Sequence, residues 1–90
     1  MKLTWDEAKR RQTLAERGLD FADVASLFAG EHFTRVDDRV AYGEPRFITA
    51  GYVKRRLVVV VWTPRDGGRR IMSMRHGHGK EEARYRRHME

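Results

Sequence analysis

Cysteine is absent from this chain, proline occurs only twice, and long apolar runs are missing. Without cysteine the protein has no disulfides, no thiolate catalysis and no cysteine-ligated zinc, which fits a reducing compartment. The longest unbroken apolar run is Leu57–Trp62, far short of the roughly 20 residues that a membrane-spanning helix needs. The segment Met1–Glu7 reaches acidic residues at once, so we expect no secretory signal peptide. These absences predict a cytoplasmic protein without a membrane association.

The chain also lacks the features that divide a protein into several domains. It has 90 residues, 40% of them hydrophobic, and it contains no repeat and no stretch rich in proline or serine. Chains of this length usually form one hydrophobic core. We therefore expect residues 1–90 to form a single domain.

Positive charge, in contrast, is abundant and unevenly distributed. Lysine and arginine number 19 against 13 acidic residues, which gives a formal net charge of +6. Residues 1–53 hold 8 basic and 9 acidic residues, whereas residues 54–90 hold 11 basic and 4 acidic ones. This asymmetry favours a polyanion or an acidic protein as partner. The alternative is an ordinary solvated basic surface, which charge alone does not distinguish from a binding surface.

The first third of the chain predicts a short strand and two helices. The strand covers Lys2–Trp5, and Asp6 can cap a helix over residues 7–17. Asp20 can cap a second helix, which ends at Gly30. The two helices would form a helical hairpin that covers one face of a sheet.

From residue 32 onward the apolar residues recur with a period of two, which is typical of strands. The strand over residues 56–63 has no polar interruption from Leu57 to Trp62, so we expect it to be central and covered on both faces. We expect a three- or four-stranded antiparallel meander, made of strands at residues 33–36, 46–53, 56–63 and 69–75.

The end of the chain places basic residues on the last strand and on a final helix, Lys80–His88. Simple alternation along the last strand puts Ile71, Ser73 and Arg75 on one face, with Met72 and Met74 on the other. The whole plan is an α+β fold.

Several cations cluster on this predicted sheet and on the helix that follows it. Guanidinium groups bind phosphate oxygens through paired hydrogen bonds, so converging arginines would favour nucleic acid. Interleaved aromatic residues such as Tyr42 and Tyr52 could stack on unpaired bases, whereas Trp62 is better explained as a core residue. The candidates for RNA binding are Arg46, Arg65, Arg70, Lys80 and Arg84.

Two histidines and one carboxylate are candidates for proton transfer. His76 and His78 follow the last strand, and no third residue with them suggests a metal site. Either imidazole could act as a general base, and each could equally be a solvated loop residue. Glu81 is either a surface partner of Tyr85 on the helix or a carboxylate that faces the arginine cluster.

Five segments of the sequence resemble the BrnT family, the toxin half of a type II toxin–antitoxin pair. They follow the family's order over nearly the whole chain, and the first and fourth segments are specific in combination. The segments are Trp5–Lys9 with Gly18–Phe21, Gly43–Phe47, Leu57–Thr63, Arg70–Arg75, and Glu81 with Tyr85.

The resemblance implies a RelE-like α+β fold and a metal-independent endoribonuclease that needs no cofactor and arrests growth. It also implies a BrnA-like antitoxin that covers the active face and alone binds operator DNA. Arg75, Glu81 and Tyr85 match the family's site residues, while His76–Gly79 depart from the small or basic residues usual there.

Cleavage would use the RNA's own 2′-hydroxyl, with Arg75 stabilising charge on the phosphorane and His76, His78 or Glu81 as base. Two other functions remain open at this point. One is a non-catalytic nucleic-acid-binding module, and the other is an inactive scaffold that only binds its partner.

Overall fold

The structure is a computed structural model that describes residues 1–39 and 41–89, except for the side chain of Met89. It confirms an α+β fold. The elements, in chain order, are β1 (Leu3–Thr4), α1 (Glu7–Arg17), the 3₁₀ turn η1 (Phe21–Asp23), α2 (Val24–Ala29), β2 (His32–Val36), β3 (Phe47–Val53), β4 (Arg56–Arg65), β5 (Gly68–His76) and α3 (Gly79–Met89).

The five strands form one sheet in the order β1-β5-β4-β3-β2. Strands β2 to β5 pair antiparallel, as the meander requires. The predicted N-terminal strand joins the same sheet as β1, which runs parallel to β5, so the sheet has five strands and is mixed; the sequence did not predict this parallel pairing. The amide of Arg69 donates to the carbonyl of Lys2 at 2.8 Å, and this contact joins the N-terminus to the far edge of the sheet.

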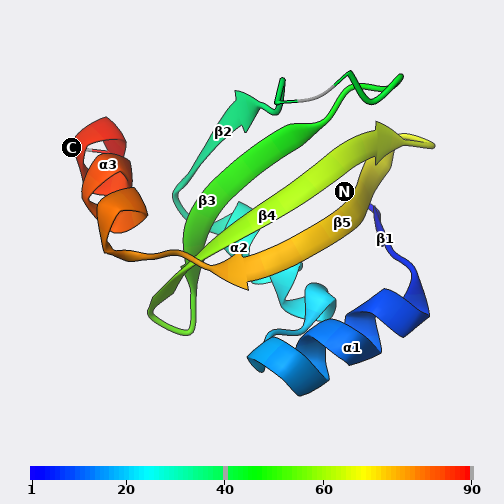
Figure 1. The fold of residues 1–90 in the computed structure, drawn as a ribbon, viewed down its shortest axis with the longest axis horizontal. Helices are drawn as coiled ribbons and strands as arrows, with labels where there is room; N and C mark the ends of the chain where they lie inside the picture. The colour runs from blue at the N-terminus through cyan, green and yellow to red at the C-terminus, as the bar shows by residue number, and fades with distance from the viewer. Residues whose placement is uncertain (40, 90) are drawn as a thin grey trace.

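The two N-terminal helices begin at the predicted caps. The Asp6 carboxylate accepts from the amide of Ala8 at 2.9 Å, and α1 ends at Gly18 with a left-handed φ of +69°. The Asp20 carboxylate accepts from the amide of Ala22, but the helix expected there starts as a 3₁₀ turn before α2. Figure 1 shows α2 passing behind β4 and β5, while α3 lies at the left beside β2 and β3.

The core lies between the sheet and the α2 side of the molecule. Its side chains come from the turn, from α2 and from alternate positions of β3, β4 and β5. The most buried apolar members are Phe21, Val24, Leu27, Val58, Val60, Ile71 and Met74, each at most 1% exposed.

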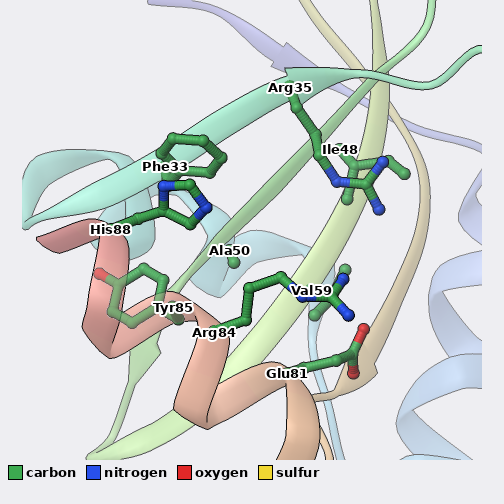
Figure 2. A pocket seen from close by; sticks show the side chains of 9 residues that line it. All are labelled: Phe33, Arg35, Ile48, Ala50, Val59, Glu81, Arg84, Tyr85 and His88. Carbon is green, nitrogen blue, oxygen red and sulfur yellow. The ribbon is translucent and has the colours of Figure 1, made fainter.

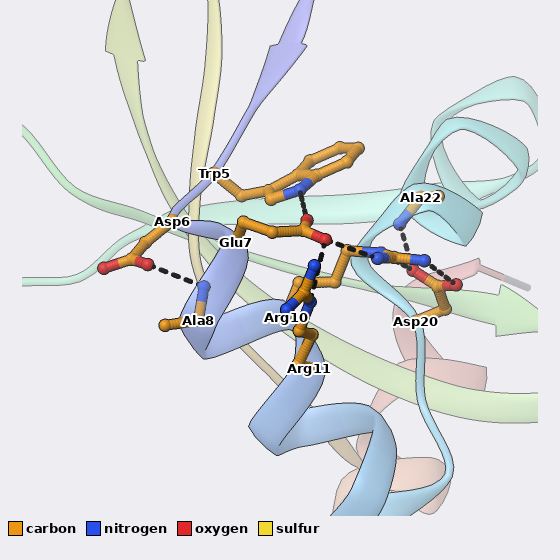
Figure 3. Close-up of polar contacts among 8 residues, drawn as sticks. All are labelled: Trp5, Asp6, Glu7, Ala8, Arg10, Arg11, Asp20 and Ala22. Atoms are coloured by element: carbon orange, nitrogen blue, oxygen red, sulfur yellow. Dashed lines mark hydrogen bonds and ion pairs between the residues drawn. The ribbon is translucent and has the colours of Figure 1, made fainter.

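Helix α1 is held by polar contacts rather than by burial. Each of its residues, all in the described part of the chain, stays at least partly exposed. The Lys9 ammonium donates to the carbonyl of Met72 at 3.2 Å, and the Arg17 guanidinium donates to that of Met74 at 2.8 Å. Arg10 pairs with Asp20 at 2.8 Å, within the network in Figure 3. The helix therefore covers the edge of β5 beyond its short pairing with β1.

A β-bulge in β5 changes which side chains share a face. Val61 pairs with Ser73 and Trp62 pairs with Ile71, so Met72 has no partner in the ladder. The predicted grouping of Ile71 with Arg75 is therefore wrong, because Ile71 packs in the core with Met74. The bulge also turns Arg70 to the face of Arg75, since their partners on β4, Thr63 and Val59, are four residues apart.

The central strand is buried on both faces, as predicted. On β4, Leu57 and Val59 point to the α3 side and are 4% and 5% exposed, while Val58 and Val60 point to the core and are fully buried. No helix of the described residues is long and apolar enough to cross a membrane.

Candidate functional site

Two rows of side chains run across the α3 face of the sheet. The first row follows the strand register from Phe33 through Ala50 and Val59 to Arg75. The second row is made of Arg35, Ile48, Val61 and Ser73. Each row has an apolar centre on β3 and β4. The first row ends in a cation at β5, and the second begins with one at β2.

Helix α3 lies over these rows and encloses a cavity of about 300 Å³. The helix contributes residues at positions i, i+3, i+4 and i+7, which lie on one helical face. Figure 2 shows Phe33, His88 and Tyr85 on one side of the cavity, with the guanidinium groups of Arg35 and Arg84 on the side nearer Glu81. The lining residues are Phe33, Arg35, Ile48, Ala50, Val59, Glu81, Arg84, Tyr85 and His88.

Arg75 and Glu81 form the strongest polar contact at this site. Both guanidinium nitrogens, Nη1 and Nη2, donate to the Glu81 carboxylate at 2.7 Å. Hydrogen bonding from Arg75 lowers the pKa of Glu81 to about 2, and the same hydrogen bonds raise the pKa of Arg75. In this state Glu81 is a carboxylate with little tendency to take a proton.

His78 completes a three-residue cluster with this pair. Its backbone amide donates to Glu81 Oε1 at 3.1 Å, as in the capping box of a helix N-terminus. Its ring Nε2 lies 3.3 Å from the same oxygen, and the side chain is 67% exposed. A solvent-accessible imidazole oriented by a carboxylate is an arrangement that can transfer protons.

Tyr85 lines the cavity but is itself buried, at 5% exposed. Its hydroxyl donates to the carbonyl of Glu31 at 2.9 Å, and its ring packs edge-on against Tyr52. Burial raises the pKa of Tyr85. These contacts fix α3 to the segment that precedes β2.

His76 points away from the Arg75 cluster. Its Nε2 lies 3.2 Å from the carbonyl of Arg17, at the end of α1. Its Nδ1 is buried and makes no hydrogen bond within the described part of the chain. The structure therefore brings His78, and not His76, to Glu81.

The cations that the sequence predicts to bind RNA lie in three separate places. Arg84 lines the cavity under α3, and Lys80 lies exposed on the first turn of α3. Arg65 and Arg70 line a second cavity of about 230 Å³, and Arg65 also pairs with Glu44 at 3.2 Å. Arg46 stacks over the Tyr42 ring, 3.9 Å from its centroid.

Among the aromatic and charged residues that line the cavity, sequence reasoning missed Phe33, Arg35 and His88. Phe33 and Arg35 alternate on β2, for which the sequence predicts only a short strand at residues 33–36. His88 lies seven residues after Glu81, and this spacing in the sequence indicates that both side chains lie on the same face of the final helix. Its ring stacks on Phe33 at 4.3 Å between centroids, which closes one end of the cavity.

Within residues 1–39 and 41–89, no group of three or more histidines and carboxylates is arranged to hold a metal ion. The polar chemistry that is present comes from guanidinium groups, one carboxylate and one imidazole. Two arginines in a mostly apolar cavity, beside such a cluster, are chemistry that suits an anionic ligand with apolar parts.

A comparison with known protein families identifies the family of this chain. The family described as the ribonuclease toxin BrnT of type II toxin–antitoxin systems matches residues 5–81. The chain belongs to this family, so the resemblance seen in its sequence is confirmed. Type II toxins are paired with an antitoxin protein, and a ribonuclease acts on RNA. A search of the curated proteins finds no match to this chain.

Proposed function

We propose that this chain is an active, metal-independent endoribonuclease whose site is the cluster of Arg75, Glu81 and His78. The observation that carries the proposal is the two-point contact of Arg75 with a carboxylate beside an arginine-lined cavity. A guanidinium fork that fits a carboxylate fits two phosphate oxygens equally well. Arg75 is therefore the group that binds the scissile phosphate.

The proposed reaction is attack of the ribose 2′-hydroxyl oxygen on the adjacent phosphorus. The bond from phosphorus to the 5′-oxygen of the next nucleotide breaks, and the products are a 2′,3′-cyclic phosphate and a 5′-hydroxyl. One proton leaves the 2′-hydroxyl and one reaches the departing 5′-oxygen, so protons balance. Negative charge grows on the phosphate oxygens in the transition state, where Arg75 stabilises it.

His78 is our candidate for the proton transfer, with Glu81 as the residue that orients it. Glu81 alone is a weak base while Arg75 holds its pKa at about 2. When a phosphate takes over Arg75, the carboxylate keeps its contact with the imidazole, which lies 3.3 Å away. His76 is a less favoured base because its ring lies against α1. Tyr85 acts by holding α3 in place.

The remaining cations are proposed to bind the RNA backbone on either side of the cleaved bond. Arg35 and Arg84 extend into the cavity, and Arg70 shares the sheet face of Arg75 because of the bulge. Phosphate contacts of this kind are independent of sequence and weaken as salt is added. Lys80, Arg46 and Arg65 would extend the path beyond the cavity.

The same face is our candidate for the antitoxin surface. We propose a BrnA-like antitoxin that covers it, forms a hetero-oligomer with the toxin in the cytoplasm and alone contacts operator DNA. We also propose that the α+β fold of this chain is RelE-like. Cover by a partner would suit the α3 side of the sheet, where Val61 and Ser73 stay partly exposed beyond the end of the cavity.

One experiment separates this function from its alternatives. Purified protein at micromolar concentration is incubated with end-labelled RNA, with and without EDTA, beside the Arg75→Ala variant. Cutting that survives EDTA, yields 2′,3′-cyclic ends and is lost in the variant supports the proposal. RNA that is bound but intact would instead indicate a binding module, and RNA that is neither bound nor cut would indicate a scaffold.

A further inference from the structure

The cavity under α3 combines an apolar floor with aromatic side chains at one end. Its floor consists of Ile48, Ala50 and Val59, and the small Ala50 side chain lies between Phe33 and Val59 in the cross-strand row. At one end the rings of Phe33 and His88 stack at 4.3 Å, with 21° between their planes. Apolar floors and aromatic walls are the surfaces on which unpaired bases pack.

Apart from the His88 ring, which stacks on Phe33, the polar side chains that remain free in this cavity are hydrogen-bond donors. Arg35 and Arg84 have no acidic partner among residues 1–39 and 41–89. The Glu81 carboxylate is occupied by Arg75 and His78, and the Tyr85 hydroxyl already donates to the Glu31 carbonyl. A base that enters the cavity therefore meets two guanidinium groups, and when a phosphate takes Arg75 the Glu81 carboxylate keeps its two contacts with His78.

The four RNA bases differ in how well they suit such a site. Guanine presents two adjacent acceptors, O6 and N7, which a guanidinium binds through two hydrogen bonds. Adenine presents N7 beside its N6 amino group, and this donor would face a guanidinium group, which is itself only a donor. Cytosine likewise presents an amino group there, and uracil presents a single acceptor on that edge.

We propose that this cavity binds one unpaired guanine of the substrate, with Arg84 and Arg35 directed at its O6 and N7. The inference rests on the proposed function, because it takes RNA as the ligand. It adds the substrate class, single-stranded RNA, and a base preference at the nucleotide next to the phosphate on Arg75. A base within a duplex does not reach the cavity, since it stays stacked and paired.

The test uses short fluorescent RNA strands that are fully 2′-O-methylated, so the proposed attack is blocked and binding is measured with the wild-type protein. The strands differ at one position, which is guanine, adenine, cytosine or uracil. Fluorescence anisotropy should give about tenfold or tighter binding of the guanine strand over the adenine strand, the size expected for one bidentate contact. The same guanine strand annealed to its complement should lose this advantage.

Two variants place the preference in the cavity. Arg84→Gln removes the guanidinium and should make the guanine and adenine strands bind equally. Ala50→Leu fills the floor and should abolish the preference, while backbone binding through the other arginines is largely kept. Arg87→Gln is the matched control, because it removes the same charge from an exposed residue of α3 outside the cavity. Its preference should equal that of wild type, and thermal unfolding checks that each variant is folded.

Cleavage of unmodified RNA by the same wild-type preparation distinguishes failure of the guanine site from failure of the proposed endoribonuclease function. RNA that is cut without any guanine preference overturns the base site and leaves the endoribonuclease in place. Equal binding of duplex and single strand also overturns it. If the unmodified strands are neither bound nor cut, the proposed function itself fails.

Discussion

Arg75 at the end of β5 and Glu81 in the first turn of α3 are joined by two hydrogen bonds of 2.7 Å each. This pair has two consequences for the protein. It fixes the N-terminus of α3 to the sheet, and it keeps the guanidinium group beside the cavity. In the proposed reaction, the carboxylate holds in the RNA-free protein the place that the substrate phosphate takes.

Replacement of Arg75 should affect cleavage more than replacement of either histidine. Arg75→Ala should lower the rate of RNA cleavage by about 100- to 1,000-fold, because charge stabilisation in the transition state is lost. Arg75→Lys keeps the positive charge but loses the paired N–H donors of the guanidinium, so its cleavage rate should lie between those of wild type and the alanine variant. The measurement is a single-turnover cleavage assay, with growth after induced expression as the second readout.

Arg56→Ala is the control for that series, since Arg56 is an exposed cation at the start of β4. It should leave cleavage and growth arrest as in wild type. Equal growth arrest by wild type and Arg75→Ala would remove Arg75 from the mechanism.

The Glu81 carboxylate should make the stability of the protein dependent on pH in the acid range. Its pKa is lowered from 4.5 to about 2 in the folded protein, chiefly by hydrogen bonds from Arg75. A lowered folded pKa contributes stability above the unfolded value and loses it as the pH falls toward the folded value. The difference in unfolding free energy between wild type and Glu81→Gln should therefore be greatest near neutral pH and shrink between pH 4.5 and about 2.

Urea unfolding at a series of pH values measures this difference. Asp37 has a pKa of about 2 for a similar reason, its contact with Arg39, and it is present in both proteins. Its contribution cancels in the comparison. A difference that stays constant down to pH 2 would mean that the Arg75–Glu81 contact does not hold α3 in solution.

The local features of the fold could be predicted because each depends on neighbouring residues. The Asp6 cap, the helix over residues 7–17 and the strand over residues 56–63 all follow from short patterns in the sequence. The bulge at Met72 could not be predicted, because alternation by two residues carries no sign of an inserted residue. The parallel pairing of β1 with β5 joins segments more than sixty residues apart, and no local pattern records it.

The candidate site was predictable in part for the same reason. Arg75 and Glu81 are six residues apart, so a strand followed by a helix brings them together. The contribution of Arg35 depends on the strand order, which places β2 under α3 at the opposite edge from β1. The separation of His76 from His78 depends on the position of α1 along β5.

Gly68 should tolerate no side chain, because a β-carbon there would collide with the backbone carbonyl oxygen of Lys2. Gly68→Ala should therefore disturb the pairing of β1 with β5 and lower the unfolding free energy by about 1–3 kcal/mol. Gly79→Ala is the matched control, since a β-carbon at Gly79 meets nothing within 4 Å in the described structure. Equal stability of the two variants in urea would place β1 away from β5.

Tyr85→Phe distinguishes a tyrosine that anchors α3 from one that donates a proton to the leaving oxygen. The Tyr85 hydroxyl is bonded to the Glu31 carbonyl at 2.9 Å, and the ring is 5% exposed. Loss of this hydrogen bond should lower the unfolding free energy by about 1 kcal/mol and leave single-turnover cleavage close to wild type. A general acid would instead contribute about 100-fold or more to the rate. Urea unfolding and cleavage measured on the same preparation decide between them, and a large loss of cleavage at unchanged stability would make Tyr85 a catalytic residue.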